Sequence, residues 1–143
     1  MRFGQMMTKP AWGALALTAL LVQGCEQPRQ VSTTRLYAID QAGGAKICNA
    51  PKAQPADGQV TELPMSLTND GGWCGLLVSK AGRPYSAGLL TARPKDGKVY
   101  VHTVGDEMRI DYTPNPGFAG NDSFLVKLVP GDGSVRVNVA VAK

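Results

Sequence analysis

Hydrophobic and polar residues alternate along the carboxyl-terminal part of the chain. In segment 134–141 (SVRVNVAV), every odd position is valine and every even position is small or polar. Successive side chains of a strand point to opposite faces, so this alternation predicts a β-strand with one face in a core. Segment 123–129 (SFLVKLV) alternates in the same way, and residues 130–133 (PGDG) predict a hairpin turn between the two strands.

Similar patterns predict further strands upstream. Segment 107–112 (EMRIDY) places Met108, Ile110 and Tyr112 on one side. A second hairpin is predicted from 89–93 through the turn 94–97 (PKDG) to 98–104, and weaker strand candidates are 35–40, 59–67 and 75–80. Seventeen glycines and ten prolines leave little room for long helices. We therefore expect an all-β fold, a small antiparallel sandwich of about seven or eight strands joined by short antiparallel connections.

The amino terminus follows a different pattern. Residues 1–12 carry Arg2 and Lys9 and no acidic residue, and residues 13–22 (GALALTALLV) form an apolar run. Ten residues rise about 15 Å as a helix, roughly half of a bilayer core, so this run is too short for a lasting membrane span. A cationic start followed by a short apolar segment is typical of a signal peptide.

Residues 21–25 (LVQGC) resemble the lipobox of bacterial lipoproteins, with an aliphatic residue at minus three and a small residue before the cysteine. The resemblance implies that signal peptide 1–24 is removed and that Cys25 is acylated, with palmitate as an expected acyl chain. Several acyl chains hold a protein firmly on a membrane, whereas one binds only marginally. The alternative is an ordinary secretory signal with a cysteine at that position.

The resemblance also carries expectations for location and domain boundaries. Glu26 stands where an aspartate would resemble an inner-membrane retention signal, so we expect the outer membrane, with the protein facing the periplasm or the cell surface. Residues 25–34 form a polar, lipidated tether, and residues 35–143 form the single domain. Cleavage removes two of the 15 basic residues and none of the 11 acidic ones, which leaves a net charge of +2. Such a charge does not indicate a nucleic-acid partner.

The two cysteines beyond Cys25 predict a disulfide. Cys48 and Cys74 would lie in an oxidising compartment, where two thiols of a small domain most often pair. Closing a loop of this length stabilises a fold by roughly 3.5 kcal/mol in the chain-entropy estimate. The alternative, metal or redox chemistry, lacks a C-x-x-C motif and has only His102 as an imidazole ligand. We expect no metal site and no cofactor besides the covalent lipid.

Residues 112–124 (YTPNPGFAGNDSF) are similar to the Y-T-P-x-x-G-F-x-G-x-D-x-F signature of bacterial Ig-like and cadherin-like surface domains. The resemblance covers residues 88–142 and implies an Ig-like β-sandwich of the kind used in spacers, adhesins and ligand-binding modules. The calcium of cadherin-like relatives is not carried over, because the acidic residues follow no calcium-loop spacing.

The same segment also has a structural reading from its residue types. The prolines end a strand, the glycines reverse the chain, Phe118 closes the end of the core, and Asp122 binds backbone amides. Tyr112 is expected to reach nearby backbone through its hydroxyl. The motif residues with these roles are Tyr112, Pro114, Gly117, Phe118, Gly120 and Asp122.

No catalytic residues are expected. His102 lies on the same strand face as Tyr100, opposite Val99 and Val101, which favours a histidine on the solvent face. No nucleophile motif accompanies it. Trp73, Tyr85 and Tyr100 are candidates for an exposed binding surface, although Trp73 is also expected to pack over the disulfide.

The expected function is therefore non-catalytic. The first hypothesis is an envelope module that binds another envelope protein or acts as an accessory or structural subunit. The alternatives are binding of cell-wall polysaccharide and, less favoured, inhibition of a periplasmic enzyme. The inhibitor hypothesis resembles lysozyme-inhibitor lipoproteins, but a domain of charge +2 poorly matches a cationic enzyme.

Overall fold

The structure is a computed structural model, and it describes residues 37–143. The predicted signal peptide 1–24, the tether 25–34 with Cys25, and the first two residues of the predicted domain lie outside the described residues. Within 37–143 the chain is almost entirely β-structure, and its nine strands follow one short 3₁₀ helix. The elements are η1 (Ala38–Gln41), β1 (Cys48–Asn49), β2 (Lys52–Ala53), β3 (Val60–Thr68), β4 (Cys74–Val78), β5 (Ala87–Ala92), β6 (Gly97–Val104), β7 (Glu107–Pro114), β8 (Gly120–Val129) and β9 (Ser134–Ala142).

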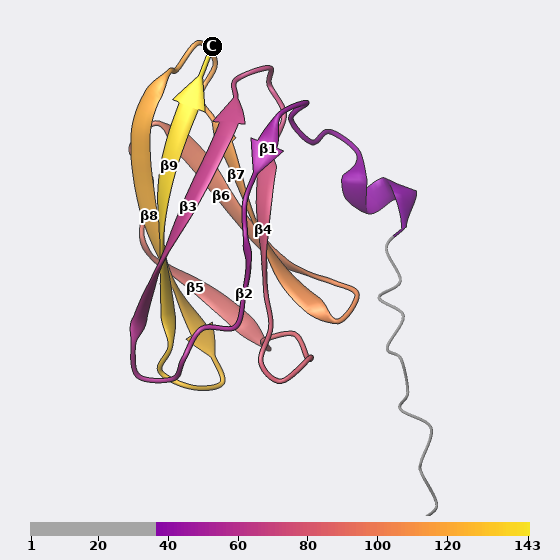
Figure 1. Ribbon diagram of the computed structural model, residues 1–143, viewed down its shortest axis with the longest axis vertical. Coiled ribbons are helices and arrows are strands. Elements are labelled where there is room, and N and C mark those ends of the chain that lie inside the picture. Colours follow the sequence, from indigo (N-terminus) through magenta and orange to yellow (C-terminus); the bar gives the residue numbers. More distant parts are fainter. Residues whose placement is uncertain (1–36) are drawn as a thin grey trace, which may run out of the picture. The chain divides into compact units, whose positions relative to one another are not determined.

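The strands form two sheets packed face to face, as Figure 1 shows. One sheet has five strands in the order β1-β3-β9-β8-β5, and the other has four in the order β2-β4-β7-β6. The prediction of an all-β sandwich is confirmed. The hairpin of β8 and β9 is also confirmed, with Phe124 opposite Val137 and Val126 opposite Val135.

Two strand pairs are parallel, so the expectation of antiparallel connections alone was wrong. β3 runs parallel to β9 over nine residue pairs, from Val60 opposite Ser134 to Thr68 opposite Ala142. β2 runs parallel to β4. A parallel pair needs a long connection, and here most of the domain separates β3 from β9 along the chain. The spacing of strands along the chain indicates pairing only between neighbouring strands, so it did not predict the pairing of β3 with β9.

The predicted hairpin of 89–93 with 98–104 was also wrong. β5 pairs with β8 in one sheet, and β6 pairs with β7 in the other. Residues 93–96, which include most of the predicted turn, instead carry the chain from one sheet to the other. Their amides at Lys95 and Asp96 donate to the Asp122 carboxylate, each at 2.9 Å, rather than to a neighbouring strand.

The weaker strand predictions had mixed outcomes. Segments 59–67 and 75–80 correspond to β3 and β4, whereas the described part of 35–40 enters η1 instead of a strand. Between η1 and β3, segment 49–58 contains β2 and a buried proline, Pro55.

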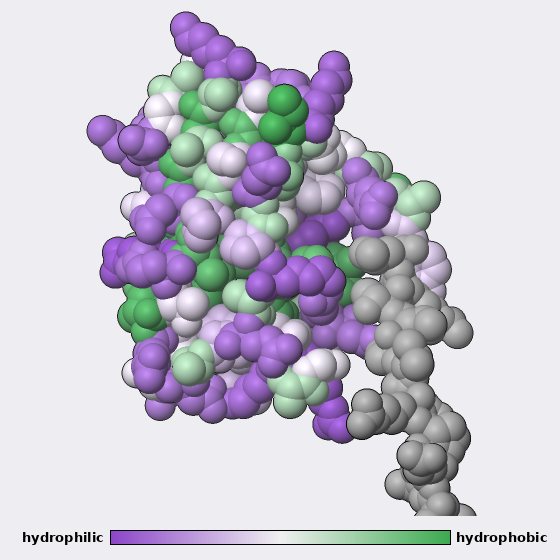
Figure 2. Space-filling model, in the orientation of Figure 1, coloured by the Kyte–Doolittle hydropathy of each residue, from purple (hydrophilic) through white to green (hydrophobic). Residues whose placement is uncertain are grey.

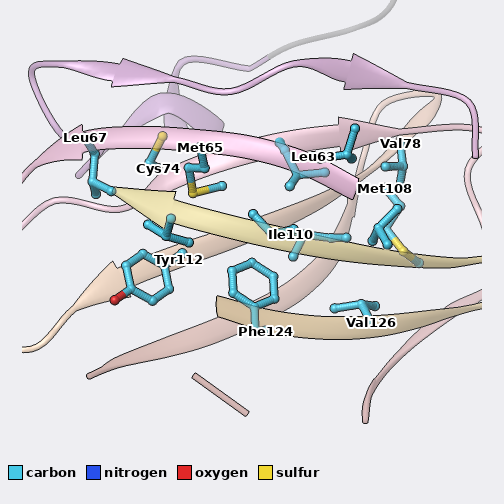
Figure 3. Close-up of a cluster of buried hydrophobic side chains, with 14 of the residues drawn as sticks. Leu63, Met65, Leu67, Cys74, Val78, Met108, Ile110, Tyr112, Phe124 and Val126 are labelled. Atoms are coloured by element: carbon cyan, nitrogen blue, oxygen red, sulfur yellow. The ribbon is translucent and has the colours of Figure 1, made fainter. Parts of the chain in front are cut away.

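The core lies between the sheets and is built from the alternating positions that the sequence predicted. Met108, Ile110 and Tyr112 of β7 face Phe124 and Val126 of β8, as Figure 3 shows. All five side chains are at most 2% exposed. Their alternation with outward residues explains why these segments form strands, because only this period buries one complete face.

The predicted disulfide joins Cys48 to Cys74, with 5.3 Å between the Cα atoms. It links β1, at the edge of the five-stranded sheet, to β4 of the four-stranded sheet. Since β1 has only two residues, the covalent bond supplements a short ladder in holding the amino-terminal segment to the sandwich.

Candidate functional site

Two charged residues of β7 are buried on the outer face of the four-stranded sheet, opposite to the core. Arg109 and Asp111 alternate with the core residues Met108, Ile110 and Tyr112, yet they are only 8% and 5% exposed. Arg109 Nε donates to Asp111 Oδ2 at 3.1 Å and lies 2.8 Å from Oδ1. Burying two charges carries a desolvation penalty, and removing one partner of a buried pair strongly destabilises the fold. The Arg109–Asp111 pair therefore restrains the positions of the groups around it.

Gly75 of β4 makes room for this ion pair. It lies opposite Asp111 in the sheet register. A Cβ at Gly75 would stand 2.3 Å from Asp111 Oδ1 and 3.0 Å from Arg109 Cδ. Asp111 Oδ1 therefore sits directly above the glycine; it lies 2.8 Å from Arg109 Nε in the ion pair, yet it accepts no hydrogen bond from the described residues. A carboxylate oxygen over a glycine Cα can gain only a weak C–H···O contact.

The Trp73 ring covers the guanidinium group of Arg109. The Arg109 Cζ atom lies 4.0 Å from the centre of the Trp73 ring, a cation–π contact. The indole Nε1 donates to the Ala42 carbonyl at 3.0 Å, and the Trp73 amide donates to Gly43 at 3.1 Å. Arg109 Nη1 also donates to the Asp40 carbonyl. Arg109 and Trp73 together fasten segment 37–45, which includes η1, to the outer face of the sheet.

These contacts change the expected role of Trp73. The sequence favoured packing over the disulfide, with an exposed platform as the alternative. The ring instead contacts Arg109 and the backbone near Gly43 and Gly44. Trp73 is partly buried and acts as a clamp on the amino-terminal segment.

His102 and Tyr100 lie beside the ion pair on the neighbouring strand, β6. His102 is opposite Arg109, and Tyr100 is opposite Asp111. His102 Nε2 lies 2.9 Å from Asp111 Oδ2, and the imidazole is 4.7 Å from the Tyr100 ring between centroids. His102 was expected on the solvent face; it is on the outer face but is bound to the buried carboxylate, with its side chain 25% exposed.

The three predicted surface aromatics do not form one surface. Tyr85 is 2% exposed and its hydroxyl reaches the Pro55 carbonyl at 3.4 Å, so its assignment to a binding surface was wrong. Tyr100 is 65% exposed. The side chains that the outer face does bring together are Tyr100, His102, Arg109, Asp111 and Trp73.

The signature residues of 112–124 form a corner between the sheets. The Asp122 carboxylate accepts from the amides of Lys95, Asp96 and Ser123 and from the Tyr112 hydroxyl. Tyr112 also reaches the Asp96 carbonyl at 3.3 Å. These contacts agree with the roles expected for the two residues.

The remaining signature residues also take their expected places. β7 ends at Pro114, and both Gly117 and Gly120 have positive φ. Phe118 packs against the core.

The protonation of this corner follows from its contacts. Burial raises the pKa of Asp122, but the three backbone amides and the Tyr112 hydroxyl outweigh it and lower the pKa overall. Burial raises the pKa of Tyr112, and the hydrogen bond to the Asp122 carboxylate raises it further. The corner is therefore held by a neutral phenol and a charged carboxylate at neutral pH.

The five-stranded sheet presents a different outer surface. A shallow depression of about 560 Å³ lies along β1, β3 and β9, lined by residues 48–51, 64–66 and Ala140. All of its lining residues are uncharged, and they include Cys48 of the disulfide. Figure 2 shows hydrophilic side chains interspersed with separate hydrophobic patches over the visible face of the molecule.

Comparisons with models of known protein families and with curated proteins found no match. In the described part of the chain, no helix is both long and apolar enough to cross a membrane. Among residues 37–143, no group of three or more histidine, cysteine or acidic side chains is placed to hold a metal ion.

Sequence reasoning missed Arg109, Asp111, Gly75 and Asp40. Charged residues at alternate positions of a strand predict a solvated face, and nothing nearby in sequence indicates that Trp73 covers Arg109. One signal was available: Arg109 and Asp111 are oppositely charged, two positions apart, and would face a histidine across any hairpin turning at residues 105–106.

Proposed function

We propose that this protein is a non-catalytic lipoprotein of the bacterial cell envelope, anchored through Cys25, and that its domain is an Ig-like module that binds another envelope protein. In this proposal it is an accessory or structural subunit, held at the outer membrane and facing the periplasm or the cell surface. The lipobox-like residues 21–25 support the anchor. The Cys48–Cys74 disulfide supports an oxidising compartment.

The observation that supports the binding role is the Tyr100–His102 pair, which lies on the outer face beside the buried Arg109–Asp111 ion pair. Tyr100 is the largest exposed aromatic surface on β6, and its neighbour His102 is held by Asp111. Asp111 is in turn fixed by Arg109. A tyrosine presented on a rigid strand loses little conformational freedom on binding, which is why tyrosine is common among residues that dominate protein interfaces.

Polysaccharide binding is the alternative function, and it relies on the same face. Stacking on a sugar needs exposed aromatic rings, and of the three aromatics first considered only Tyr100 is largely exposed. Protein binding needs only one such anchor with polar neighbours, and His102 supplies the polar neighbour. The geometry therefore favours a protein partner over a glycan.

The binding proposal is tested with a photo-reactive phenylalanine analogue at position 100 of the full chain, made in bacterial cells. The matched control carries the analogue at Val60, which is 51% exposed on β3 of the other sheet. We expect position 100, and not position 60, to capture one dominant envelope protein. Equal capture from both positions, or capture of no protein, contradicts the proposal. Binding of purified polysaccharide without protein capture favours the alternative.

The anchor is tested separately. Cys25→Ser in the full chain should abolish acylation, detected by mass spectrometry, and should release the protein from the membrane fraction. Retention of the variant in the membrane contradicts lipid anchoring but does not affect the crosslinking result.

A further inference from the structure

The four edge strands of the two sheets are not equally protected against pairing with another chain. β1 and β2 have two residues each. β5 is interrupted by a register shift between Leu90 and Ala92. β6, in contrast, has eight residues and pairs with β7 without interruption from Gly97 to Val104. Short length and bulges are common ways in which proteins block an edge, and β6 uses neither.

β6 also lacks the other usual forms of edge protection along most of its length. It contains no proline, and Lys98 near its beginning is its single lysine or acidic residue. The hairpin closes on residues 105–106, so Val104 and Glu107 form its first hydrogen-bonded pair. Hydrogen-bonded and non-hydrogen-bonded pairs then alternate along the ladder. The backbone groups of Val99, Val101 and Thr103 consequently point away from β7, toward the open edge.

The side chains beneath this edge are incompletely covered. Val99 and Val101 pack against the core, yet they are only partly buried, in contrast to Val135 and Val137 at the middle of the other sheet. An added strand would cover the flank of both valines and satisfy the outward backbone groups. The edge of β6 thus combines open hydrogen-bonding groups with uncovered apolar surface.

We propose that β6 pairs antiparallel with β6 of a second copy of this chain, joining two four-stranded sheets into one continuous sheet. Val101 lies opposite Val101 of the second copy, and Val99 lies opposite Thr103. The outward backbone groups then face each other as hydrogen-bonded pairs. Such an interface is isologous, because the same segment of both copies meets around a two-fold axis.

The side chains select this register. With Val101 at the centre, Tyr100 lies opposite His102 of the second copy, and Lys98 lies opposite Val104. A strip of four rings results on the outer face. Shifting the centre to Tyr100 would instead place His102 opposite Lys98, so the imidazole would face an ammonium group and not an aromatic ring. Shifting the centre to His102 would leave pairs only between residues 100 and 104 of the two strands, fewer than the pairs between residues 98 and 104 in the proposed register.

The two-fold axis also suits two chains held in one membrane, a step that rests on the proposed lipid anchor. Antiparallel pairing within a sheet places the same face of both sheets on the same side. Segment 37–45 is fastened to the outer face in each copy through Arg109 and Trp73. Both amino-terminal segments therefore lie on one side of the joined sheet.

The test uses two differently tagged full chains made in the same cells, one with Tyr100→Cys and the other with His102→Cys. Facing residues of a non-hydrogen-bonded pair have Cα atoms about 4.5 Å apart, within the range of a disulfide. We expect a disulfide between positions 100 and 102 of the two tagged chains, identified by peptide mass spectrometry. The same mapping must recover the Cys48–Cys74 peptide, which reports that the variants fold.

Two controls make the result specific. Leu89→Cys places an exposed cysteine on the bulged edge strand β5 and should give no intermolecular disulfide. Adding Thr103→Pro to both chains should abolish the 100–102 link, because it removes an outward amide while leaving the β7 ladder intact.

The proposal is overturned if folded chains give no 100–102 link. It is also overturned by equal linking from position 89, by preferential linking of position 100 to itself, or by disulfides to a different protein. The capture experiment at position 100 is scored separately, because mass spectrometry distinguishes a crosslink to a second copy of this chain from a crosslink to a different envelope protein.

Discussion

The Tyr112 hydroxyl donates a 2.9 Å hydrogen bond to Asp122 Oδ2, and this contact joins β7 of one sheet to β8 of the other. The same carboxylate accepts the amides of Lys95 and Asp96, in the connection that crosses between the sheets. A single buried phenol and a single carboxylate therefore tie together both sheets and the crossing segment. The chemistry of this corner is structural: it fixes how the two sheets meet.

Replacing Tyr112 with phenylalanine should destabilise the domain by about 1 kcal/mol at neutral pH, the typical contribution of one hydrogen bond. The folded state raises the pKa of Tyr112, so its contribution is complete below the unfolded value of about 10 and declines as the pH rises above it. The difference between wild type and Tyr112→Phe in urea unfolding should therefore shrink above about pH 10. Tyr100→Phe, at an exposed site, serves as the control. A difference that is constant with pH would contradict this account.

Replacing Asp122 with asparagine should remove part of the acid sensitivity of the fold. The folded state lowers the pKa of Asp122, so its contribution is present above the unfolded value of about 4 and is lost as the pH falls through the lower folded value. Asp122→Asn should cost about 2 kcal/mol at neutral pH, because hydrogen bonds to a charged group are stronger than neutral ones. Its stability should change less than that of wild type between about pH 5 and pH 2.

The matched control for this acid measurement is Asp132→Asn. The Asp132 side chain is 82% exposed and pairs with Lys127 at 3.3 Å on the surface. A surface pair of this kind contributes little, so the variant should follow the wild-type pH profile. Equal flattening by both substitutions would show that Asp122 has no special part in acid unfolding.

The sequence predicted those parts of this fold that depend on neighbours along the chain. The β8–β9 hairpin, the core face of β7 and the corner around Asp122 each follow from a local alternation or a local turn. The parallel pairing of β3 with β9 and the passage of residues 93–96 between sheets depend on distant segments. No periodicity records which sheet a strand joins, because β5 and β6 would alternate in the same way in either arrangement.

The candidate site was less predictable for the same reason. His102 and Tyr100 could be placed on one face from their spacing, but the burial of Arg109 and Asp111 requires Trp73 and segment 37–45 to cover them. For Tyr85 the sequence predicted an exposed ring, whereas the ring is buried. Its segment has no alternation that would have placed it inside, and its burial depends on packing near Pro55.

Breaking the buried Arg109–Asp111 ion pair and replacing it entirely by apolar side chains should affect the stability of the domain differently. Arg109→Met alone should destabilise the domain by about 3 kcal/mol or more, because it leaves Asp111 buried without its charged partner. The double variant Arg109→Met/Asp111→Leu should recover part of this loss, since buried apolar side chains can replace an ion pair. Urea unfolding measures both variants. A double variant less stable than the single one would contradict this balance.

Arg109→Met should also loosen the clamp on the amino-terminal segment. Trp73 is the single tryptophan of residues 25–143, so fluorescence of the processed protein reports its surroundings. Loss of the guanidinium over the ring should change the emission and its accessibility to a quencher. Unchanged Trp73 emission would show that Arg109 does not hold the ring in place.

Loss of the Cys48–Cys74 disulfide should destabilise the domain by roughly 3.5 kcal/mol, from the entropy of closing the loop in the unfolded chain. The double variant Cys48→Ser/Cys74→Ser tests this by thermal or urea unfolding. Thiol counting on the unreduced wild-type protein should find both cysteines unreactive. Free thiols at these positions would contradict the disulfide, independently of the stability result.

Gly75 offers the sharpest test of the outer-face network, because its role is steric and not conformational. A methyl group at Gly75 would stand 2.3 Å from Asp111 Oδ1, so Gly75→Ala must displace the carboxylate or the Arg109 side chain. We expect a loss of about 1–3 kcal/mol, typical of overpacking, together with a changed Trp73 emission. The matched control for the stability measurement is Gly44→Ala, whose added methyl group would meet the Gln41 carbonyl and the Trp73 ring at an ordinary 3.6 Å. Since alanine normally favours a strand over glycine, a neutral or stabilising Gly75→Ala would show that the ion pair can relax without cost, and the rigid base proposed for Tyr100 and His102 would then be refuted.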